Sequence, residues 1–592
     1  MCGIIGYIGN KDCKQVLIDA LKKLEYRGYD SSGVAFVINN NYKIIKCVGR
    51  ISNLVEKLNT ENFNNASIGI GHTRWATHGI SNDTNAHPHY GKTCILVHNG
   101  IIENYLELKN ELTDKNHLFY SDVDSEVITK LIDDTQGDSN LDILLKVSKK
   151  LIGSFALNII FKNELDKIYI VKKDSPLIVG INKEKKYICS DINSISDYCK
   201  NFIYLPNNSV GIISKNNIDL FNFNGNKLFY EIEKLELFEE EANKKDYEHY
   251  MLKEIEEEPS VLENTLKNNL ENSLLKINMD EYKGINKIVI IGCGSAMHAG
   301  LIGKYYLEKF ARIETNVEIA SEYRYKDLIV NKKTLAIFVS QSGETADTLA
   351  CLKMLKEKGI KTLSFVNVYN SSIAKLSDKV VYTNVGKEIA IASTKSLTGQ
   401  ILYLILFSLK LANKRNTLSL KKIKMYTNNL LNIPSQLTYI LNNKKELKKI
   451  AKLINKHKKI IFIGRGIDYY ICLESSLKLK EITYIPSSCY QAGELKHGPI
   501  SLIDEKTLVF VLNTNSNTLN KTLSNEQEIL ARNGNVYSIS TLHNCNYQID
   551  DSYFSNVFSS IMIFQLIAYY TALLKKLDID KPRNLAKSVT VE

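Results

Sequence analysis

The chain has 592 residues, more than a single hydrophobic core usually holds, so several domains are expected. Hydrophobic residues make up 44% and charged residues 24% of the sequence, which is typical of packed globular proteins and excludes a disordered or fibrous chain. The net charge of +11 comes from lysines spread along the sequence, and because no aromatic residues alternate with them, a nucleic-acid surface is not predicted.

The cysteines and the apolar segments indicate in which cellular compartment the protein is expected to lie. The 11 cysteines are an odd number without paired metal-ligand spacing, which favours a reducing compartment and predicts no metal site. The residues after Met1 carry no basic segment, so no secretory signal is predicted. Residues 401–411 are too few to span a membrane and 557–574 are interrupted by Gln565, so both are expected to be buried helices. We therefore expect a cytoplasmic protein that binds no membrane.

The first part of the chain, to about residue 237, alternates short β-rich runs with amphipathic helical segments. The runs are 67–71, 93–98, 154–161 and 167–171, and one such helix is 124–134. The charged segment 238–246 has no apolar periodicity, which indicates a linker. A mixed α and β domain is therefore predicted to precede a separate part of the chain.

The rest of the chain contains an internal duplication. Residues 287–294 and 459–466 are apolar runs that end in Gly-x-Gly, and further apolar runs follow at 333–339 and 506–512. Each run indicates a buried strand that leads into a helix, which predicts two α/β lobes with mostly parallel sheets. The predicted divisions are 2–238 for the first domain, 239–250 for the linker, 251–282 for a helical lead-in, 283–420 for lobe 1, 450–582 for lobe 2 and 583–592 for a C-terminal tail.

Cys2 is a candidate nucleophile. Once Met1 is removed, it carries a thiol and a free α-amino group with a pKa of about 7.7 to 8.0. Such an amine can act as general base for the thiol, directly or through one water, so no histidine is needed. A buried structural cysteine is the ordinary interpretation of Cys2 alone.

Three further segments carry polar groups that form a set with Cys2. Arg74, at the end of a predicted strand, has a guanidinium suited to a carboxylate. Asn99 and Gly100, at the end of another predicted strand, offer a side-chain amide and a backbone N–H, the donors of an oxyanion hole. Asp124 opens the helix 124–134, where a helix N-cap is the ordinary interpretation.

These segments resemble the class II glutamine amidotransferase family of N-terminal-nucleophile hydrolases. The motifs that carry the resemblance are Cys2-Gly3-Ile4, residues 26–31, Arg74-Trp75, Asn99-Gly100 and Asp124. The resemblance implies an α+β sandwich in which Cys2 attacks the glutamine amide while Asn99 and Gly100 stabilise the oxyanion. It also implies that Arg74, Trp75 and Asp124 bind glutamine, and that a glutamyl thioester is hydrolysed to glutamate.

Residues 340–345 form a Ser-rich segment between a predicted strand and a predicted helix. Its hydroxyls and backbone N–H groups are expected to face outward at the positive end of the helix, where phosphate binds. A Ser-rich helix cap fits this spacing about as well. The corresponding segment of lobe 2, 513–517, lacks the pattern, so only lobe 1 is expected to bind phosphate.

Lobe 2 and the tail carry candidate acid–base groups. Lys478 and Glu481 share a helix face at i,i+3, a spacing that usually indicates a surface ion pair. His497 follows closely, in a loop bounded by glycine and proline, which makes a functional pair more persuasive here. Lys587 lies in the tail, where a frayed terminus is the default expectation.

The two lobes resemble the sugar isomerase (SIS) domain family through these motifs, which implies two doubly wound α/β lobes. The sugar-phosphate contacts that the resemblance implies are Ser295, Ser340, Gln341, Ser342, Thr345, Ile391, Ser393 and Ala586. Lys587 would form a Schiff base with the ketose. Glu481 would move a proton between C1 and C2 with help from Lys478. His497, supplied by a neighbouring subunit, would assist ring opening.

Together the two resemblances imply one enzyme that delivers ammonia from L-glutamine to D-fructose 6-phosphate. No cofactor is expected, and a homodimer is expected because His497 would cross between subunits. Ammonia would pass through a dry channel gated by Trp75, and the tail would cap the sugar site. Gly294-Ser295-Ala296 departs from the Gly-Thr-Ser common in the family, which predicts a weaker sugar contact.

Other interpretations stay open at this point. The same amidotransferase domain precedes a phosphoribosyltransferase or an ATP-using synthetase in other families, but neither pattern is present in the second part of the chain. SIS lobes also serve as sugar-phosphate sensors, although a sensor would not require Cys2, Glu481 and Lys587 together. A deglycase, or an enzyme for another keto-sugar phosphate, also fits the motifs.

Overall fold

The structure is a computed structural model that describes residues 2–61, 66–76, 78–234, 244, 246–282 and 284–590. The chain divides into two compact units, residues 1–239 with 588–592 and residues 240–587. The predicted linker 239–250 lies partly outside the described residues, because 239–243 and 245 are not among them.

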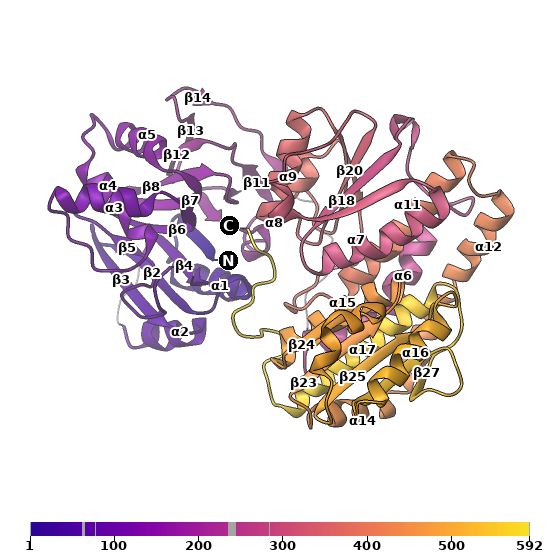
Figure 1. Ribbon diagram of the computed structural model, residues 1–592. Coiled ribbons are helices and arrows are strands. Elements are labelled where there is room, and N and C mark those ends of the chain that lie inside the picture. Colours follow the sequence, from indigo (N-terminus) through magenta and orange to yellow (C-terminus); the bar gives the residue numbers. More distant parts are fainter. Residues whose placement is uncertain are drawn as a thin grey trace. The chain divides into compact units, whose positions relative to one another are not determined.

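The first unit contains two antiparallel sheets that pack face to face (Figure 1). One sheet has the strand order β15 (Glu233–Lys234), β11 (Asn201–Tyr204), β9 (Ile178–Asn182), β10 (Lys185–Cys189), β1 (Gly3–Ile8), β4 (Ile68–Arg74), β2 (Ser31–Ile38), β3 (Asn41–Val48). The other has the order β14 (Lys227–Leu228), β13 (Ile218–Asn222), β12 (Ser209–Ser214), β8 (Glu164–Lys173), β7 (Gly153–Phe161), β6 (Cys94–Ile102), β5 (His89–Tyr90).

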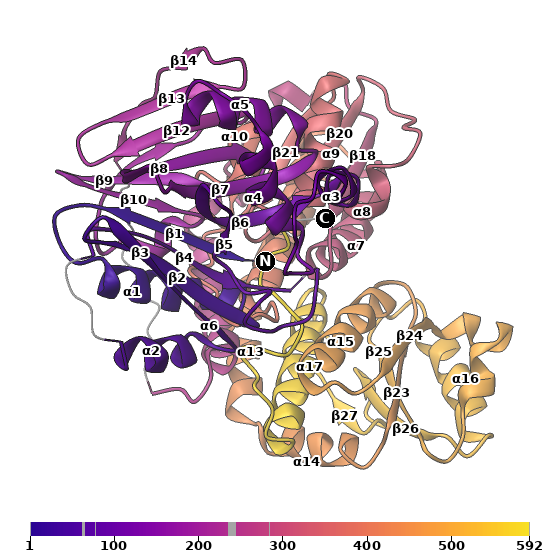
Figure 2. The same ribbon diagram turned by 90° about the vertical axis from the view of Figure 1, so that its left-hand side faces the viewer.

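Helices cover the outer face of each sheet. They are α1 (Lys14–Leu24), η1 (Glu25–Arg27), α2 (Ile51–Asn59), α3 (Tyr105–Asp114), α4 (Asp124–Asp134), α5 (Asn140–Lys150) and η2 (Ile192–Ser194). The helix α1 buries Leu17, Leu21 and Leu24, which share one face at helical spacing, against the sheet that contains β1 (Figure 2). The helices α3, α4 and α5 cover the other sheet. The resulting layers, helix, sheet, sheet, helix, confirm the predicted α+β sandwich.

The second unit contains two parallel sheets with the same strand order. In lobe 1 the order is β19 (Glu314–Ile319), β18 (Lys287–Gly292), β20 (Thr334–Ser340), β21 (Lys361–Val366), β22 (Lys379–Tyr382). In lobe 2 it is β24 (Ser487–Gln491), β23 (Lys459–Gly464), β25 (Thr507–Asn513), β26 (Asn535–Ser540), β27 (Tyr547–Gln548). Within each sheet the second strand in space comes first in sequence, so the chain winds outward in both directions, which confirms the predicted doubly wound lobes.

The helices of the second unit surround both sheets. Before and within lobe 1 they are α6 (Tyr250–Asn269), η3 (Asp280–Tyr282), α7 (Ser295–Tyr306), η4 (Leu307–Ala311), α8 (Ala320–Tyr323), α9 (Ala346–Glu357), α10 (Ser372–Leu376) and α11 (Lys395–Lys414). Between the lobes and within lobe 2 they are α12 (Leu420–Leu430), α13 (Ile433–Asn442), α14 (Lys445–Ile454), α15 (Ile467–Thr483), η5 (Ala492–His497), η6 (Pro499–Leu502), α16 (Leu519–Leu530) and α17 (Ser555–Leu574).

The lead-in to lobe 1 is helical only to Asn269, so the prediction of helix to 282 is wrong in its second half. The chain there forms a hairpin of β16 (Leu270–Glu271) and β17 (Leu274–Leu275). Asn272 and Ser273 at its tip have φ of 51° and 66°. Two successive residues with positive φ form the tight turn that joins antiparallel strands and that a helix cannot contain.

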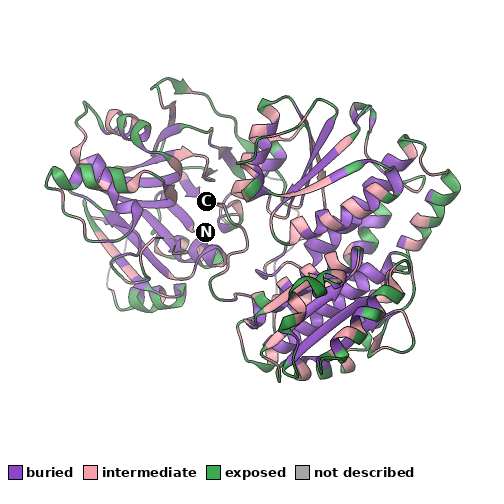
Figure 3. Ribbon diagram, viewed as in Figure 1, coloured by how far each residue is buried: buried purple, intermediate pink, exposed green. Residues whose placement is uncertain are grey.

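The two lobes share one hydrophobic core. It includes Ile290 and Ile337 from the first sheet and Phe462 and Phe510 from the second, together with buried faces of α6, α7, α11, α15 and α17 (Figure 3). The helix α17 is long and apolar enough to cross a membrane, with a mean hydropathy of 1.8, but 89% of that window is buried inside the protein. The predicted burial of 401–411 and 557–574 is therefore confirmed.

Candidate active sites

The Cys2 thiol lies beside the turn that follows β4. Because Gly3 pairs with Thr73 in the sheet, the residue before β1 meets the residues after β4. The Trp75 N–H donates to Cys2 Sγ at 3.3 Å, and the thiol lies 3.6 Å from the Trp75 carbonyl oxygen. Burial raises the pKa of the Cys2 thiol, so a neighbouring base is needed to form the thiolate.

The motif at 26–31 shapes the same turn. A Cβ at Gly28 would lie 2.6 Å from the Trp75 nitrogen, so only glycine fits beneath the Arg74–Trp75 peptide. Asp30 fixes the turn from the other side, since its N–H donates to the Arg74 carbonyl at 2.9 Å and its carboxylate accepts the Ala76 N–H at 2.7 Å. This motif therefore positions the Cys2 environment through the backbone.

Asn99 and Gly100 lie inside a strand and not at its end, where they were predicted. The strand β6 continues to Ile102, and Gly100 pairs with Phe155 of β7. Gly100 has φ of 137°, and a Cβ there would lie 1.9 Å from the Ser154 carbonyl oxygen. The Asn99 side-chain amide donates to the Cys2 carbonyl oxygen at 2.9 Å, while its own Oδ1 is buried with no hydrogen-bond partner.

Arg74 and Asp124 lie near Cys2 and are both only 2% exposed. Arg74 donates to the carbonyl oxygens of His78 and Gly79, the latter at 3.2 Å. Asp124 does not cap its own helix; its Oδ2 accepts the N–H of Ile102, the last residue of β6, at 2.9 Å. The charges of Arg74 and Asp124 both act on the pKa of the Cys2 thiol, so the structure brings these three groups together.

In lobe 1, the segment 340–345 follows β20 and leads into α9. Ser340 is buried, and its hydroxyl accepts the Gly343 N–H at 3.0 Å and lies 3.2 Å from the Thr345 hydroxyl. The Ser342 hydroxyl accepts the Glu344 N–H at 3.2 Å. The expectation that all these hydroxyls face outward is therefore wrong for Ser340, because a turn this tight uses its own donors and acceptors.

Neighbouring segments hold this loop in place. Gly343 has φ of 66°, and a Cβ there would lie 2.0 Å from the Ser371 hydroxyl. The Glu344 carboxylate accepts the Ser372 N–H at 2.8 Å and the Ser372 hydroxyl at 2.7 Å, which connects the loop to the start of α10. The Gln341 carbonyl accepts the Asn367 N–H at 3.1 Å.

A buried cluster between α7 and α15 contains two of the candidate acid–base groups. Lys478 contacts Glu481 at 2.7 Å and Glu474 at 3.3 Å, and its side chain is 1% exposed, so this is not a surface ion pair. Glu474 also accepts the Ser295 hydroxyl at 2.9 Å and lies 2.7 Å from His298 Nδ1. Burial acts to lower the pKa of Lys478, but the charges of Glu481 and Glu474 outweigh it and raise that pKa, so Lys478 stays a cation.

Lys587 is paired in a buried site. Its ammonium contacts the Glu388 carboxylate, and the two side chains are 5% and 0% exposed. Glu388 also accepts the N–H groups of Thr394 at 2.9 Å and Ser396 at 3.1 Å. Burial acts to raise the pKa of Glu388, but the charge and hydrogen bond of Lys587 lower it below its usual range.

The segment around Glu388 also contains the predicted sugar contacts Ile391 and Ser393. The Ile391 N–H donates to the Asp580 carbonyl at 3.0 Å, and the Asp580 carboxylate accepts the Tyr250 and Met251 N–H groups, both at 2.9 Å. The segment just before the tail is therefore fixed to α6. Ala586 is half-buried next to Lys587. His497 is exposed at the end of η5 and takes no part in the contacts described above.

Sequence reasoning missed Glu388 and Glu474. Glu474 had a signal, because it lies four residues before Lys478 and seven before Glu481, on the same face of α15. No sequence signal pointed to Glu388, since it lies in an irregular segment 199 residues from Lys587.

Comparisons with known proteins match both units. A family model described as glutamine amidotransferase domain matches residues 72–197, and one described as SIS domain matches residues 281–409 and 452–546. The chain is 42% identical over 609 residues to proteins of Clostridium tetani and of Clostridium acetobutylicum, each called glutamine–fructose-6-phosphate aminotransferase (isomerizing), with 100% of both chains covered.

A solved structure resembles the second part of the chain. It is the C-terminal domain of glucosamine-fructose-6-phosphate aminotransferase from Francisella tularensis, with 37% sequence identity and a TM-score of 0.56. The match covers 58% of this chain and 100% of that one.

Proposed function

Because the chain belongs to the family of isomerizing glutamine–fructose-6-phosphate aminotransferases, we propose that it makes D-glucosamine 6-phosphate and L-glutamate from D-fructose 6-phosphate and L-glutamine, the first step of hexosamine biosynthesis. The 2–238 part releases ammonia from glutamine, and lobes 283–420 and 450–582 bind and isomerise the sugar. The segments 239–250, 251–282 and 583–592 are the linker, lead-in and tail of this division. The reaction needs no cofactor.

The first half-reaction is amide hydrolysis through a thioester. Cys2 Sγ attacks the side-chain carbonyl carbon of glutamine, and the α-amino group of Cys2, freed by removal of Met1, takes the thiol proton and passes it to the departing ammonia. Asn99 and Gly100 stabilise the tetrahedral oxyanion, and Arg74, Trp75 and Asp124 hold the substrate. Water then hydrolyses the thioester to glutamate. The raised pKa of the Cys2 thiol supports the need for the amine as base.

The second half-reaction is amination and isomerisation of the sugar. The sugar phosphate is held by Ser340, Gln341, Ser342 and Thr345, and the uncharged Lys587 amine attacks the C2 ketone to give a Schiff base and water. Ammonia replaces Lys587 at C2. Glu481, held by Lys478, then takes a proton from C1 and returns one to C2, which leaves an aldehyde at C1 and an amine at C2.

The observation that carries this proposal is the buried Lys587–Glu388 pair in the same chain as the Cys2 site. A sugar-phosphate sensor requires no amine that can form a Schiff base. A glutaminase alone requires no phosphate loop. We also propose that the enzyme is a cytoplasmic homodimer in which the exposed His497 assists ring opening in the neighbouring subunit.

The test is a coupled assay without metal or nucleotide. Purified protein is incubated with L-glutamine and D-fructose 6-phosphate, and glutamate and glucosamine 6-phosphate are measured for wild type, Cys2→Ala and Lys587→Arg. Equal yields of both products are expected from wild type. Neither product is expected from Cys2→Ala, and glutamate alone from Lys587→Arg.

A different result would reject each part of the proposal. Glutamate without amino sugar from the wild type would reject D-fructose 6-phosphate as substrate, and other keto-sugar phosphates would then be assayed. Neither product from a chain shown by mass spectrometry to lack Met1 would favour the sensor. Equal glucosamine 6-phosphate from Lys587→Arg would reject the Schiff base.

A further inference from the structure

Lobes 1 and 2 have the same backbone geometry around the phosphate loop. Lys287 pairs with Thr334 in lobe 1 and Lys459 pairs with Thr507 in lobe 2, so the two central strands have equal registers. The turn into α7 has Gly294 at φ 53° and ψ −129°, and the turn into α15 has Gly466 at φ 58° and ψ −123°. The residues of these strands and of the turns that follow them therefore correspond one to one in the two lobes.

The loop after the third strand in space is also of equal length in both lobes. It runs from the end of β20 at Ser340 to the start of α9 at Ala346, and from the end of β25 at Asn513 to the start of α16 at Leu519. Thr514 and Asn515 of lobe 2 therefore correspond to Gln341 and Ser342 of the proposed phosphate loop, and Thr518 corresponds to Thr345.

In lobe 2 a carboxylate of the chain itself binds this loop. Asp468 Oδ2 accepts the N–H groups of Thr514 at 2.8 Å and Asn515 at 3.1 Å, and Oδ1 accepts the Thr514 hydroxyl at 2.5 Å. Asp468 is the second residue of α15 and is fully buried. An anionic group held by two successive backbone N–H groups and a hydroxyl at helix N-termini has the contacts that such loops make with phosphate.

The counterpart of Asp468 in lobe 1 is Ala296, the second residue of α7. A methyl group cannot accept a hydrogen bond, so the side chain at this position of lobe 1 cannot hold the loop as Asp468 does in lobe 2. This single difference in side chain distinguishes the two loops. The lobe 2 loop already binds the Asp468 carboxylate, whereas Ala296 leaves the lobe 1 loop able to bind an external anion.

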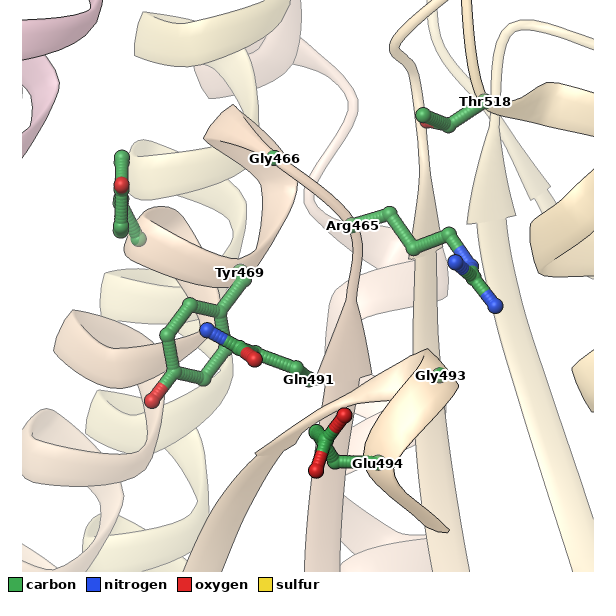
Figure 4. A pocket seen from close by; sticks show the side chains of 8 residues that line it. Arg465, Gly466, Tyr469, Gln491, Gly493, Glu494 and Thr518 are labelled. Carbon is green, nitrogen blue, oxygen red and sulfur yellow. The ribbon is translucent and has the colours of Figure 1, made fainter. Parts of the chain in front are cut away.

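Space for a ligand remains next to the loop of lobe 2. A cavity of about 350 Å³ is lined by Gly466 and Thr518, the counterparts of Gly294 and Thr345. Figure 4 shows Gly466 at the turn into α15, Thr518 above the Arg465 side chain, and Tyr469, Gln491 and Glu494 below Gly466. Lack of room is therefore not what excludes phosphate from lobe 2.

We propose that lobe 2 keeps a latent phosphate site that Asp468 closes from within, so that each chain binds phosphate only in lobe 1. This rests on the proposed function of the lobe 1 loop. Asp468 thereby acts as a specificity residue, because it directs the phosphate group of the substrate to the lobe that lies next to Lys587 and Glu388.

The test counts phosphate sites in a reciprocal pair of variants. Inorganic phosphate is titrated into the full-length wild type, Asp468→Ala, Ala296→Asp and the double variant, and the number of sites is measured by equilibrium dialysis. We expect one site per chain for wild type, two for Asp468→Ala, none for Ala296→Asp and one for the double variant. The negative charge in Ala296→Asp should weaken phosphate binding by about 100-fold.

The outcomes separate this inference from the function on which it rests. No phosphate site in the wild type would reject the lobe 1 loop itself. One site in the wild type and still one in a folded Asp468→Ala would reject the inference. If Asp468→Ala does not fold, Ala296→Asp decides alone: unchanged phosphate affinity would overturn the inference, while lost affinity with intact glutaminase activity would support it.

Discussion

Glu388 is the residue that controls the state of the candidate Schiff-base lysine. It holds Lys587 as an ion pair and also accepts two backbone N–H groups, so it fixes both the amine and the segment that carries Ile391 and Ser393. Lys587 must leave this pair and lose a proton before it can attack a ketone. A substrate that enters the site therefore competes with Glu388 for Lys587.

The variant Glu388→Gln should separate the two half-reactions. An amide still accepts backbone N–H groups, but it has no negative charge to pair with the ammonium and cannot receive its proton. We therefore expect glucosamine 6-phosphate formation to fall about 100-fold while glutamate release continues. Initial rates of both products measure this. Glu257→Gln is the matched control, since Glu257 pairs with Lys395 at 2.8 Å, and should keep both rates. Wild-type sugar amination in Glu388→Gln would contradict the assignment.

Gly100 has no room for a side chain. The variant Gly100→Ala places a Cβ against the Ser154 carbonyl at a positive φ, so β6 and β7 must move apart and Asn99 must shift from Cys2. We expect lost glutaminase activity and a lower melting temperature, followed by the fluorescence of Trp75, the single tryptophan of the chain. Gly225 also has a positive φ, of 83°, but a Cβ there would meet no backbone atom. Gly225→Ala should therefore lower the melting temperature less than Gly100→Ala does. Equal effects would mean that the backbone angle alone matters.

At the scale of elements, Glu474 connects α7 to α15 and therefore lobe 1 to lobe 2. It accepts hydrogen bonds from Ser295 and pairs with His298 on one helix and Lys478 on the other. Burial acts to raise the pKa of Glu474, but the charge of Lys478 and the bonds from His298 and Ser295 outweigh it and lower that pKa. The Glu474 carboxylate is therefore charged, and its partners are Ser295, His298 and Lys478 of the same chain.

The variant Glu474→Ala should be strongly destabilising. Removing one partner of a buried pair leaves Lys478 with less compensation for its charge, which typically costs about 3–5 kcal/mol of unfolding free energy. Chemical denaturation of the full chain, followed by far-UV circular dichroism, measures this. Glu446→Ala removes the exposed pair with Lys449 and should change the unfolding free energy little. A loss in Glu474→Ala no larger than in Glu446→Ala would contradict the role of Glu474.

The elements were more predictable from sequence than the contacts between them. The helix 124–134 and the duplicated strands were found because burial imposes a clear apolar period on them. The continuation of β6 past Gly100 was missed because glycine usually interrupts a strand. The roles of Glu388 and Asp468 were missed because each depends on a partner far away in sequence, and a single charged residue gives no periodic signal.

At the scale of the whole molecule, acid should act on the two units differently. The first unit buries His72, His87, His89 and His98 close together, with the rings of His72 and His87 stacked at 4.0 Å. Burial lowers the pKa of all four, that of His72 to about 3. The folded unit therefore cannot bind the protons that the same histidines take up when unfolded.

The sign of the pH effect follows from this difference. Stability from these histidines is fully present above pH 6.5 and is lost as the pH falls toward about 3, since only the unfolded chain gains protons in that interval. His72 alone should account for about 1.4 kcal/mol between pH 7.5 and pH 5.5. Trp75 fluorescence melts at these two pH values should show a lower melting temperature at pH 5.5. In His89→Gln the decrease should be smaller, whereas the exposed His543→Gln should match wild type.

The hydrophobic core that the two lobes share limits how the second unit can be divided into fragments. Phe462 and Phe510 of one sheet and Ile290 and Ile337 of the other all belong to it, so one face of each sheet is covered by elements that both lobes supply. The opposite faces have separate clusters, which include Ile291 in lobe 1 and Ile463 in lobe 2. A gene cut between α11 and α14 would yield two fragments that each present an uncovered apolar face to water. Such fragments would aggregate when produced separately and recombine when produced together, as the halves of one folding unit and not as two modules.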